Sequence, residues 1–384
     1  MEFVHTSDWH LGRLFHQVSL LQDQKYLLDQ LLQALKERPA AALVIAGDVY
    51  DRSVPPAEAV NLLDHFLDQV LSELKLPVLM IPGNHDSADR LGFAARHLHQ
   101  AGLHIFSDLH SVDQPVCLEV DGQKVDFYGI PYADPQRVAE LYADELGSDS
   151  RLDFNQAHTF LVERIKQNWN PAHKNVLISH CFLDGASESE SERPLSIGGA
   201  DRVDWQPLKD FDYVALGHLH APQYKGAEWI RYSGSLMKYS FSEVNQSKGV
   251  VRVSLGEQAT QTSLQELKPL RQLRILEGTL DELLEQGRTD PKADDYLLVR
   301  LEDRQALLNP MARLREFYPN LLHLERKKLL PEGANPRPRG EQLKRNELAL
   351  FEDFFQQTRD ESLTPAQQEV LKKVIEQARQ EVQA

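Results

Sequence analysis

The chain has 384 residues, 41% of them hydrophobic and 26% charged, a length that accommodates one large domain and a smaller one. No apolar run approaches the roughly 18 residues of a membrane span, and the first residues lead into a strand without the pattern of a signal peptide. We therefore expect a cytoplasmic protein whose two cysteines, Cys117 and Cys181, are reduced. The net charge of −16 argues against a simple nucleic-acid-binding domain, although a duplex meets local rather than total charge.

Five apolar strands in the first part of the chain each end in side chains that commonly bind metals. They are Asp8 and His10 after residues 3–7, Asp48 after 42–46, Asn84 and His85 after 78–81, His180 after 175–179, and His218 and His220 after 213–216. Taken alone, Gly83-Asn84 would equally be an ordinary turn. In open α/β sheets, however, sites collect at the carboxyl ends of strands, so distant segments can converge. The side chains at these five strand ends are therefore predicted to form one common metal site.

Helical segments alternate with these strands. Leucines repeat at three and four residues from Leu20 to Leu35, before Pro39, and a similar pattern runs from Pro56 to Leu74. This alternation predicts a layered α/β core. Residues 117–120 and 125–130 are predicted to form a hairpin, and residues 229–232 and 249–255 to form further strands.

The segment 184–202 has no apolar periodicity and is predicted to be a loop, with Ser and Glu alternating from Ser187 to Glu192. Because it follows His180 directly, it either shapes the cleft or is a solvated acidic excursion. The sequence leaves both interpretations open.

A smaller α/β unit is predicted after the last ligand-bearing strand. Strands are expected at 272–277, 296–301 and 321–324, with one helix between Thr279 and Gly287 and another from Asn309. Several basic residues make this unit locally positive: Arg313, Arg315, Arg326, Lys327 and Lys328. Residues 1–266 and 267–330 are thus the two predicted domains.

The last part of the chain is predicted to be an extended linker followed by two amphipathic helices. Residues 331–345 are rich in Pro, Gly and Arg, and residues 346–384 contain helical patterns at 347–356 and 364–382. Apolar stripes beyond a linker are typical of a docking element. The alternative is that the helices pack on their own chain.

The candidate ligands restrict the metal. Asp, His and Asn supply only oxygen and nitrogen, which favours Mn, Mg, Fe or Zn. Seven ligands exceed the needs of one ion and suit two ions about 3.5–4 Å apart that share a bridging carboxylate. The seven are Asp8, His10, Asp48, Asn84, His180, His218 and His220.

These motifs resemble, in order and spacing, the five motifs of the calcineurin-like metallophosphoesterases. They are Asp8-Trp9-His10, Gly47-Asp48, Gly83-Asn84-His85-Asp86, His180 and Gly217-His218-Leu219-His220. Residues 6–12 and 191–200 are similar to the branch that contains DNA double-strand-break repair nucleases, and the resemblance is strong up to about residue 255. It implies an α/β fold with a two-sheet sandwich flanked by helices, a small α/β capping domain that presents DNA, and a C-terminal helix pair.

The resemblance also implies how the seven ligands are shared between the two metal ions. Asp8, His10, Asp48 and His220 would hold one ion, and Asp48, Asn84, His180 and His218 the other, with Asp48 bridging. Two cations, Mn being the expected metal, would activate water for in-line attack, so that no protein nucleophile is needed.

Other residues near the motifs have expected roles in catalysis or substrate binding. His85 exceeds the ligand count, so we expect it to contact the scissile phosphate and to protonate or stabilise the leaving oxygen. The Asp51 carboxylate is expected to orient His85, or alternatively to cap a loop. Arg13, Arg52 and Arg90 either hold phosphates or are solvated surface residues. His97, His99 and His110 fit no pattern and are interpreted as surface or packing residues.

Three functional hypotheses follow. The first is a Mn-dependent DNA exonuclease and endonuclease that acts on DNA ends and hairpins in repair and recombination. By resemblance it would be a homodimer within a heterotetramer and would bind an SbcC-type coiled-coil ATPase through residues 346–384. The alternatives are a phosphoesterase for small-molecule or protein substrates and a scaffold with vestigial metal sites. The intact ligand set argues against the scaffold, and the capping unit and helix pair favour the nuclease.

Overall fold

The computed structural model describes residues 1–147, 150–192, 201–303, 305, 307–326, 355 and 363–383. The chain divides into two compact units, Met1–Lys327 and Lys328–Ala384. The predicted linker at 331–345 and, apart from Phe355, the predicted helix at 347–356 lie outside the described residues. Among the residues that are described, no helix is both long and apolar enough to cross a membrane.

Two six-stranded sheets form the main part of the first unit. The first has the order β16-β15-β1-β4-β5-β6 and the second the order β13-β14-β12-β9-β8-β7. The first contains β1 (Glu2–Thr6), β4 (Leu43–Ala46), β5 (Val78–Ile81), β6 (Leu103–Ile105), β15 (Gly249–Leu255) and β16 (Thr260–Glu266). The second contains β7 (Val116–Val120), β8 (Gln123–Ile130), β9 (Lys174–His180), β12 (Tyr213–Gly217), β13 (Gln223–Lys225) and β14 (Ala227–Tyr232). Strands β1, β4 and β5 are parallel, as are β8, β9 and β12, so their carboxyl ends lie at one edge of each sheet.

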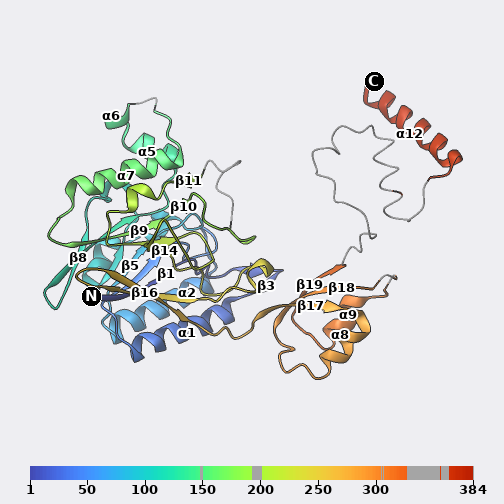
Figure 1. Ribbon diagram of the computed structural model, residues 1–384, viewed down its shortest axis with the longest axis horizontal. Helices are drawn as coiled ribbons and strands as arrows, with labels where there is room; N and C mark the ends of the chain where they lie inside the picture. The colour runs from blue at the N-terminus through green and yellow to red at the C-terminus, as the bar shows by residue number, and fades with distance from the viewer. Residues whose placement is uncertain are drawn as a thin grey trace. The chain divides into compact units, whose positions relative to one another are not determined.

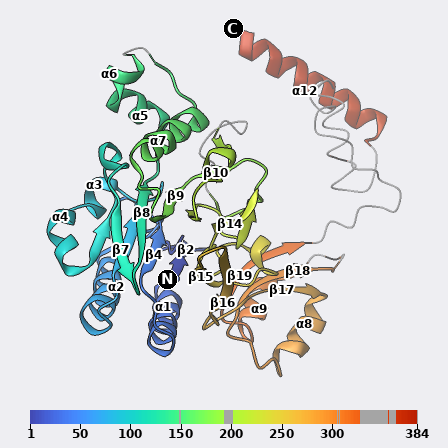
Figure 2. The ribbon, with the colours of Figure 1, turned by 60° about the vertical axis from the view of Figure 1, so that its left-hand side comes forward.

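The sheets pack face to face with helices on both outer sides. Phe3 of β1 packs edge-on against Phe127 and Tyr213 of the second sheet, with ring centroids 5.5 and 5.6 Å apart. Helices α1 (Leu21–Glu37) and α2 (Ala57–Asp68) bury their leucine stripes on the first sheet, and α7 (Phe154–Asn168) covers the second. The order helix, sheet, sheet, helix is visible in both views (Figure 1, Figure 2). It confirms the predicted two-sheet sandwich.

Two helical features differ from the sequence prediction. The expected helix at 56–74 is α-helical only to Asp68 and continues as the π-helical segment η1 (Gln69–Glu73). Helix α7 was not predicted, although Asp153 and Gln156 form a capping box at its start. Its buried residues Ala157, Leu161 and Ile165 repeat at intervals of four, as in an amphipathic helix.

A smaller parallel sheet, of order β17-β18-β19, follows the sandwich. It consists of β17 (Leu273–Gly278), β18 (Tyr296–Leu301) and β19 (Leu321–Arg326), with α8 (Leu280–Gly287) and α9 (Pro310–Arg315) packed on it. The predicted capping box between Thr279 and Glu282 is present. The Arg315 guanidinium, however, donates to the Leu321 main-chain oxygen at 2.9 Å, so this charge serves the unit's own structure.

The second unit contains α12 (Pro365–Gln383), which confirms the predicted helix at 364–382. Thr364 and Gln367 cap its start through hydrogen bonds of 2.9 Å, as the capping-box pattern indicates. Val370 and Val374 are 63% and 53% exposed on this helix, which leaves an apolar stripe open to solvent. Cys117 and Cys181 are both free, as expected from the composition.

Candidate metal centre

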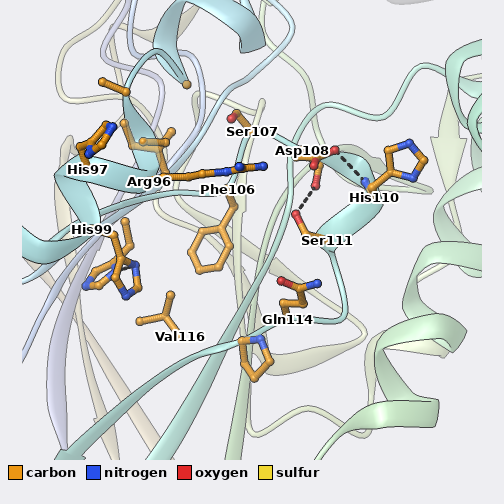
Figure 3. A pocket seen from close by; sticks show the side chains of 16 residues that line it. Arg96, His97, His99, Phe106, Ser107, Asp108, His110, Ser111, Gln114 and Val116 are labelled. Atoms are coloured by element: carbon orange, nitrogen blue, oxygen red, sulfur yellow. Dashed lines mark hydrogen bonds between the residues drawn. The ribbon is translucent and has the colours of Figure 1, made fainter.

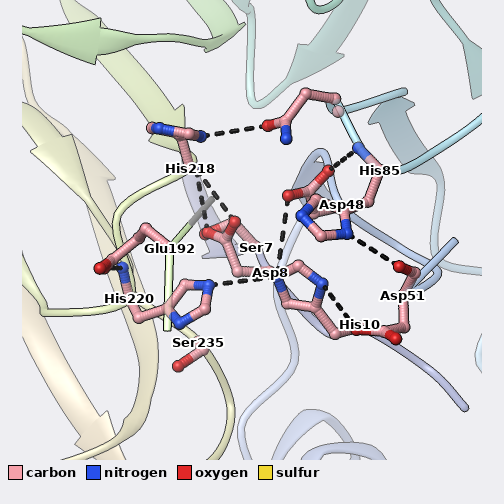
Figure 4. Close-up of polar contacts among 12 residues, drawn as sticks. Ser7, Asp8, His10, Asp48, Asp51, His85, Glu192, His218, His220 and Ser235 are labelled. Carbon is pink, nitrogen blue, oxygen red and sulfur yellow. Dashed lines mark hydrogen bonds and ion pairs between the residues drawn. The ribbon is translucent and has the colours of Figure 1, made fainter. Parts of the chain in front are cut away.

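The seven predicted ligands meet where the carboxyl ends of both sheets come together. Asp8 and His10 follow β1, Asp48 follows β4 and Asn84 follows β5, while His180 ends β9 and the remaining two histidines follow β12. Six of the seven are buried, and Asn84 is half-buried. Figure 4 shows Asp8, Asp48, His218 and His220 directed toward a common centre. The rule that sites collect at strand ends therefore locates this cluster correctly.

The ligand atoms form two overlapping groups. Those of Asp8, His10 and His220 lie within 4.8 Å of one another, as do those of Asp8, Asp48 and His180. Asp48 belongs to the second group and also reaches the first, because its Oδ2 lies 3.4 Å from His180 Nε2 and 3.7 Å from His10 Nε2. This position suits a bridging carboxylate.

The loops that carry these ligands are held in an unusual backbone conformation. Asp8, His10, Asp48 and His218 have positive φ angles of 53°, 45°, 49° and 105°. Such backbone in a non-glycine residue costs on the order of 1–3 kcal/mol and persists only where surrounding contacts enforce it. The loops after β1 and β4 supply those contacts, because Asp8 N–H donates to the Gly47 oxygen at 3.0 Å and His10 N–H to the Asp48 oxygen at 2.9 Å.

The two sheets touch at the Ala46 carbonyl. His180 Nδ1 donates to this oxygen at 2.9 Å, and a Cβ on Gly217 would lie only 1.9 Å from it. Only glycine fits at position 217. The hydrogen bond commits the Nδ1 proton of His180 to the main chain, which directs Nε2 toward Asn84 Oδ1, 3.0 Å away.

Several nitrogen and oxygen atoms of the ligand set lie within hydrogen-bond distance of one another. His10 Nε2 and His220 Nε2 are 3.1 Å apart, and His180 Nε2 and His218 Nδ1 both approach Asn84 Oδ1, at 3.0 and 3.1 Å. Each of these contacts can hold one proton in the metal-free site, and a divalent cation that took the same atoms as ligands would displace it. The oxygen and nitrogen donors thus fit divalent cations of the Mn, Mg, Fe or Zn type.

The protonation states favour metal binding. Burial lowers the pKa of His218 to about 3 and that of His10 well below its usual value, so both rings are neutral at pH 7. Burial raises the pKa of Asp8 to about 6. For His180, burial opposes the charged form, but the Asp48 carboxylate outweighs it and raises the His180 pKa to about 9. The same pairing holds the pKa of Asp48 well below its usual value despite burial.

The described part of the acidic loop reaches the site, which answers the question that the sequence left open. Ser191 Oγ lies 2.6 Å from His220 Nδ1, and Glu192 Oε1 accepts the His220 main-chain N–H at 2.7 Å. Buried Glu243 contacts Ser191 Oγ and pairs with Lys248 Nζ at 2.6 Å. Sequence reasoning missed these supporting residues, because no spacing rule connects the four to His220.

His85 is in the predicted place, but its contact with Asp51 differs from the prediction. His85 Nδ1 donates to the main-chain oxygen of Asp51 at 2.8 Å rather than to the carboxylate. The carboxylate lies 3.4 Å from Arg13 and 3.7 Å from His10 Nδ1, and one of its oxygens is within 4.8 Å of a His85 ring nitrogen. The hydrogen bond that holds the His85 ring therefore comes from the Asp51 main chain, and a role for the Asp51 carboxylate in orienting His85 stays a prediction. Half-buried His85 keeps Nε2 as the nitrogen not held by the main chain.

The three predicted substrate-binding arginines differ in position. Arg13 lies over the Tyr239 ring, 4.9 Å from its centroid, and also donates to the Ser191 oxygen at 3.2 Å. Arg52 is exposed and near enough to oppose the burial that raises the pKa of Asp51. Arg90 is exposed on the short helix α3 (Ala88–Leu91). Only Arg13 is packed directly beside the ligand set.

Asp86 has a structural role that the motif alone did not reveal. Its carboxylate accepts the main-chain N–H groups of Val49, Tyr50 and Gly83 at 3.0, 2.9 and 2.9 Å. Asp86 therefore links the loop after β4 to the loop after β5 through hydrogen bonds. This contact keeps Asp48 and Asn84 side by side.

The histidines that fit no motif line a separate cavity of about 830 Å³ (Figure 3). His97, His99 and His110 are among its lining residues, and His99 Nδ1 lies 2.8 Å from His104 Nδ1. The cavity lies between β6 and the start of β7 and contains none of the seven predicted ligands.

Comparisons with known proteins agree with the motifs. Residues 1–222 match the family model described as calcineurin-like phosphoesterase, and residues 257–359 match that described as type 5 capsule protein repressor C-terminal domain. A protein of Staphylococcus epidermidis that is named as a subunit of the nuclease SbcCD is 34% identical over 376 residues, 98% of either chain. A protein of the same name from Staphylococcus saprophyticus is 34% identical over 375 residues, again 98% of either chain. A solved dimetal phosphatase from Danio rerio is 13% identical with a TM-score of 0.40, covering 70% of this chain and 98% of its own.

Metal binding should release protons. At about pH 7.5 the metal-free site holds a proton on His180, whose pKa is about 9, and a cation that takes its Nε2 must displace that proton. Calorimetric titration with Mn²⁺ in buffers of different ionisation enthalpy should detect about one proton released per chain. Below pH 6 Asp8 becomes protonated as well, so affinity should fall as the pH drops through that value. His97→Gln, outside the site, should behave as the wild type, and an enthalpy independent of the buffer would contradict the assignment.

Proposed function

The chain belongs to the calcineurin-like phosphoesterase family, together with the two staphylococcal relatives named for the nuclease SbcCD, and we propose that it is a metal-dependent DNA nuclease. The proposed reaction is hydrolysis of phosphodiesters at DNA ends and hairpins, as exonuclease and endonuclease. The supporting observation is the convergence of donor atoms from five strand ends, with His10 Nε2 and His220 Nε2 only 3.1 Å apart. Two divalent cations, Mn²⁺ being our choice, would supply a Lewis-acidic centre that activates water and neutralises phosphate charge.

The chain's own residues would then position the substrate and supply the proton that the leaving oxygen takes up. Asp8 and Asp48 provide fixed negative charge, and Asp48 Oδ1 accepts the His85 main-chain N–H at 2.8 Å, which fixes His85 next to the ligand set. The Asp51 carbonyl holds His85 Nδ1, so Nε2 is the ring atom that would face the leaving oxygen. Arg13, held by Asp51 and Tyr239, adds positive charge at the rim.

The competing phosphoesterase function for small or protein substrates uses the same ligand set. The nuclease is favoured because the α/β unit of β17–β19 and the helix α12 have no evident use with a small substrate. The two staphylococcal relatives align with 98% of the chain, a length that includes both the α/β unit and the segment of α12. We further propose that residues 346–384 dock on an SbcC-type coiled-coil ATPase, with the chain as a homodimer in a heterotetramer.

His85→Ala should retain both metal ions and lose most of its activity on DNA. The substitution removes the proposed proton donor but none of the seven proposed ligands, so the rate should fall by about 10²–10⁴-fold. Single-turnover cleavage of linear DNA with Mn²⁺, alongside elemental analysis of bound metal, tests this expectation, and His97→Ala serves as the matched control. Loss of an ion in the His85 variant would make His85 a ligand. Hydrolysis of bis-p-nitrophenyl phosphate without cleavage of DNA would instead favour the alternative function.

The docking proposal is tested in the full-length chain and by truncation. Val370→Glu combined with Val374→Glu places charge on the exposed apolar stripe of α12 and should abolish co-purification with the ATPase. Lys373→Glu, on the same helix, is the charge control and should still bind. A chain that ends near Pro336 should keep Mn²⁺-dependent cleavage of accessible DNA ends but not bind the ATPase. Unchanged binding by the valine variant or the truncated chain would refute the docking assignment.

A further inference from the structure

A second group of metal-ligating side chains lies on the outer face of the second sheet. Cys117 of β7 pairs in register with Asp126 of β8, and His173 directly precedes β9. Their ligand atoms lie within 4.8 Å of one another, and His173 Nδ1 is 2.9 Å from Asp126 Oδ2. We propose that this cluster binds a single borderline or thiophilic divalent cation, with Zn²⁺ as the physiological type.

Two buried polar atoms beside the cluster support a ligand there. Asn175 of β9 is in register with Asp126, so both side chains lie on the same sheet face. Asn175 is only 5% exposed, and its Oδ1 has no hydrogen-bond partner among the described residues. The hydroxyl of Tyr128, two residues beyond Asp126 on the same face, is buried and equally unpartnered within that set. Unsatisfied buried polar groups cost free energy, and two of them on the sheet face that carries the cluster indicate a missing partner.

The donor chemistry differs from that of the dinuclear centre. Cysteine, histidine, aspartate and the Asn175 oxygen together offer the sulfur, nitrogen and oxygen set of a four-coordinate zinc site. The two sites lie at opposite ends of β9, because His173 precedes the strand and His180 ends it. At about 3.3 Å per residue the separation is roughly 20 Å. None of the ligands is shared.

The cluster is accessible. Cys117 is exposed, so an ion can reach the sulfur from solvent. The bound ion would also neutralise the buried Asp126 carboxylate, which is 3% exposed.

A cation at this position would stabilise the pairing of the edge strand of the second sheet. Within the described part of the chain, β7 is the last strand of that sheet and is paired only with β8. Ligands from β7, β8 and the start of β9 would cross-link three consecutive strands of the sheet. The role is structural, because binding to the folded state alone stabilises it by mass action.

Cobalt substitution tests the proposal without relying on enzymatic activity. The full chain, reduced with a non-thiol reductant, is titrated with Co²⁺ and followed by near-ultraviolet absorption, where a thiolate bound to cobalt gives a charge-transfer band. The dinuclear centre has no sulfur ligand and is silent in this band. We expect the band in the wild type and in Cys181→Ser, and its loss in Cys117→Ser. Asp126→Asn and His173→Gln should each weaken binding by at least about tenfold.

Three results would overturn the proposal. The first is a wild-type chain that shows no such band at saturating Co²⁺. The second is a band that persists in Cys117→Ser, which would place the thiolate elsewhere. The third is unchanged affinity in both Asp126→Asn and His173→Gln, which would mean that Co²⁺ binds an exposed thiol without a built site.

Discussion

The hydrogen bond from His180 Nδ1 to the Ala46 carbonyl is the contact on which the site depends. It links the last residue of β9 in the second sheet to the last residue of β4 in the first, over 2.9 Å. The sheets can approach this closely because position 217, at the end of β12, carries no Cβ, which would lie 1.9 Å from the same oxygen. Ligands from both sheets therefore face one point, and the direction of the His180 ring is set before any cation arrives.

Charge compensation explains how such a site can remain folded. Two buried carboxylates, Asp8 and Asp48, would be strongly destabilising without counter-charge. His180 provides part of this charge, because the pairing with Asp48 raises its pKa and keeps its ring protonated despite burial. The neutral rings of His10 and His218 can accept a cation. Main-chain donors complete the arrangement: His218 N–H donates to Asp8 Oδ1 at 3.0 Å, and His85 N–H donates to Asp48 Oδ1 at 2.8 Å.

Strand ends were predictable from the sequence, whereas contacts between loops were not. Apolar strands closed by Asp, Asn or His mark the ligands, because parallel strands bring their carboxyl ends to one edge. Ser191 contacts His220 and Glu243, which are 29 and 52 positions away, through side chains whose pairing no periodicity encodes. The Asp51 hydrogen bond was not predictable for a related reason: the sequence identifies the residue but not that its main-chain oxygen accepts from His85. Helix α7 was not predicted, although its capping box and its buried residues at intervals of three and four are both readable in the sequence.

The central claim is that the two sheets together build a dinuclear metal centre. Crystals grown with Mn²⁺ and measured at wavelengths on either side of the manganese absorption edge test it most directly. The account predicts two anomalous peaks about 3.5–4 Å apart, with Asp48 between them, His10 and His220 on one side and His180 and His218 on the other. A single peak, or peaks that do not contact Asp48, would contradict it.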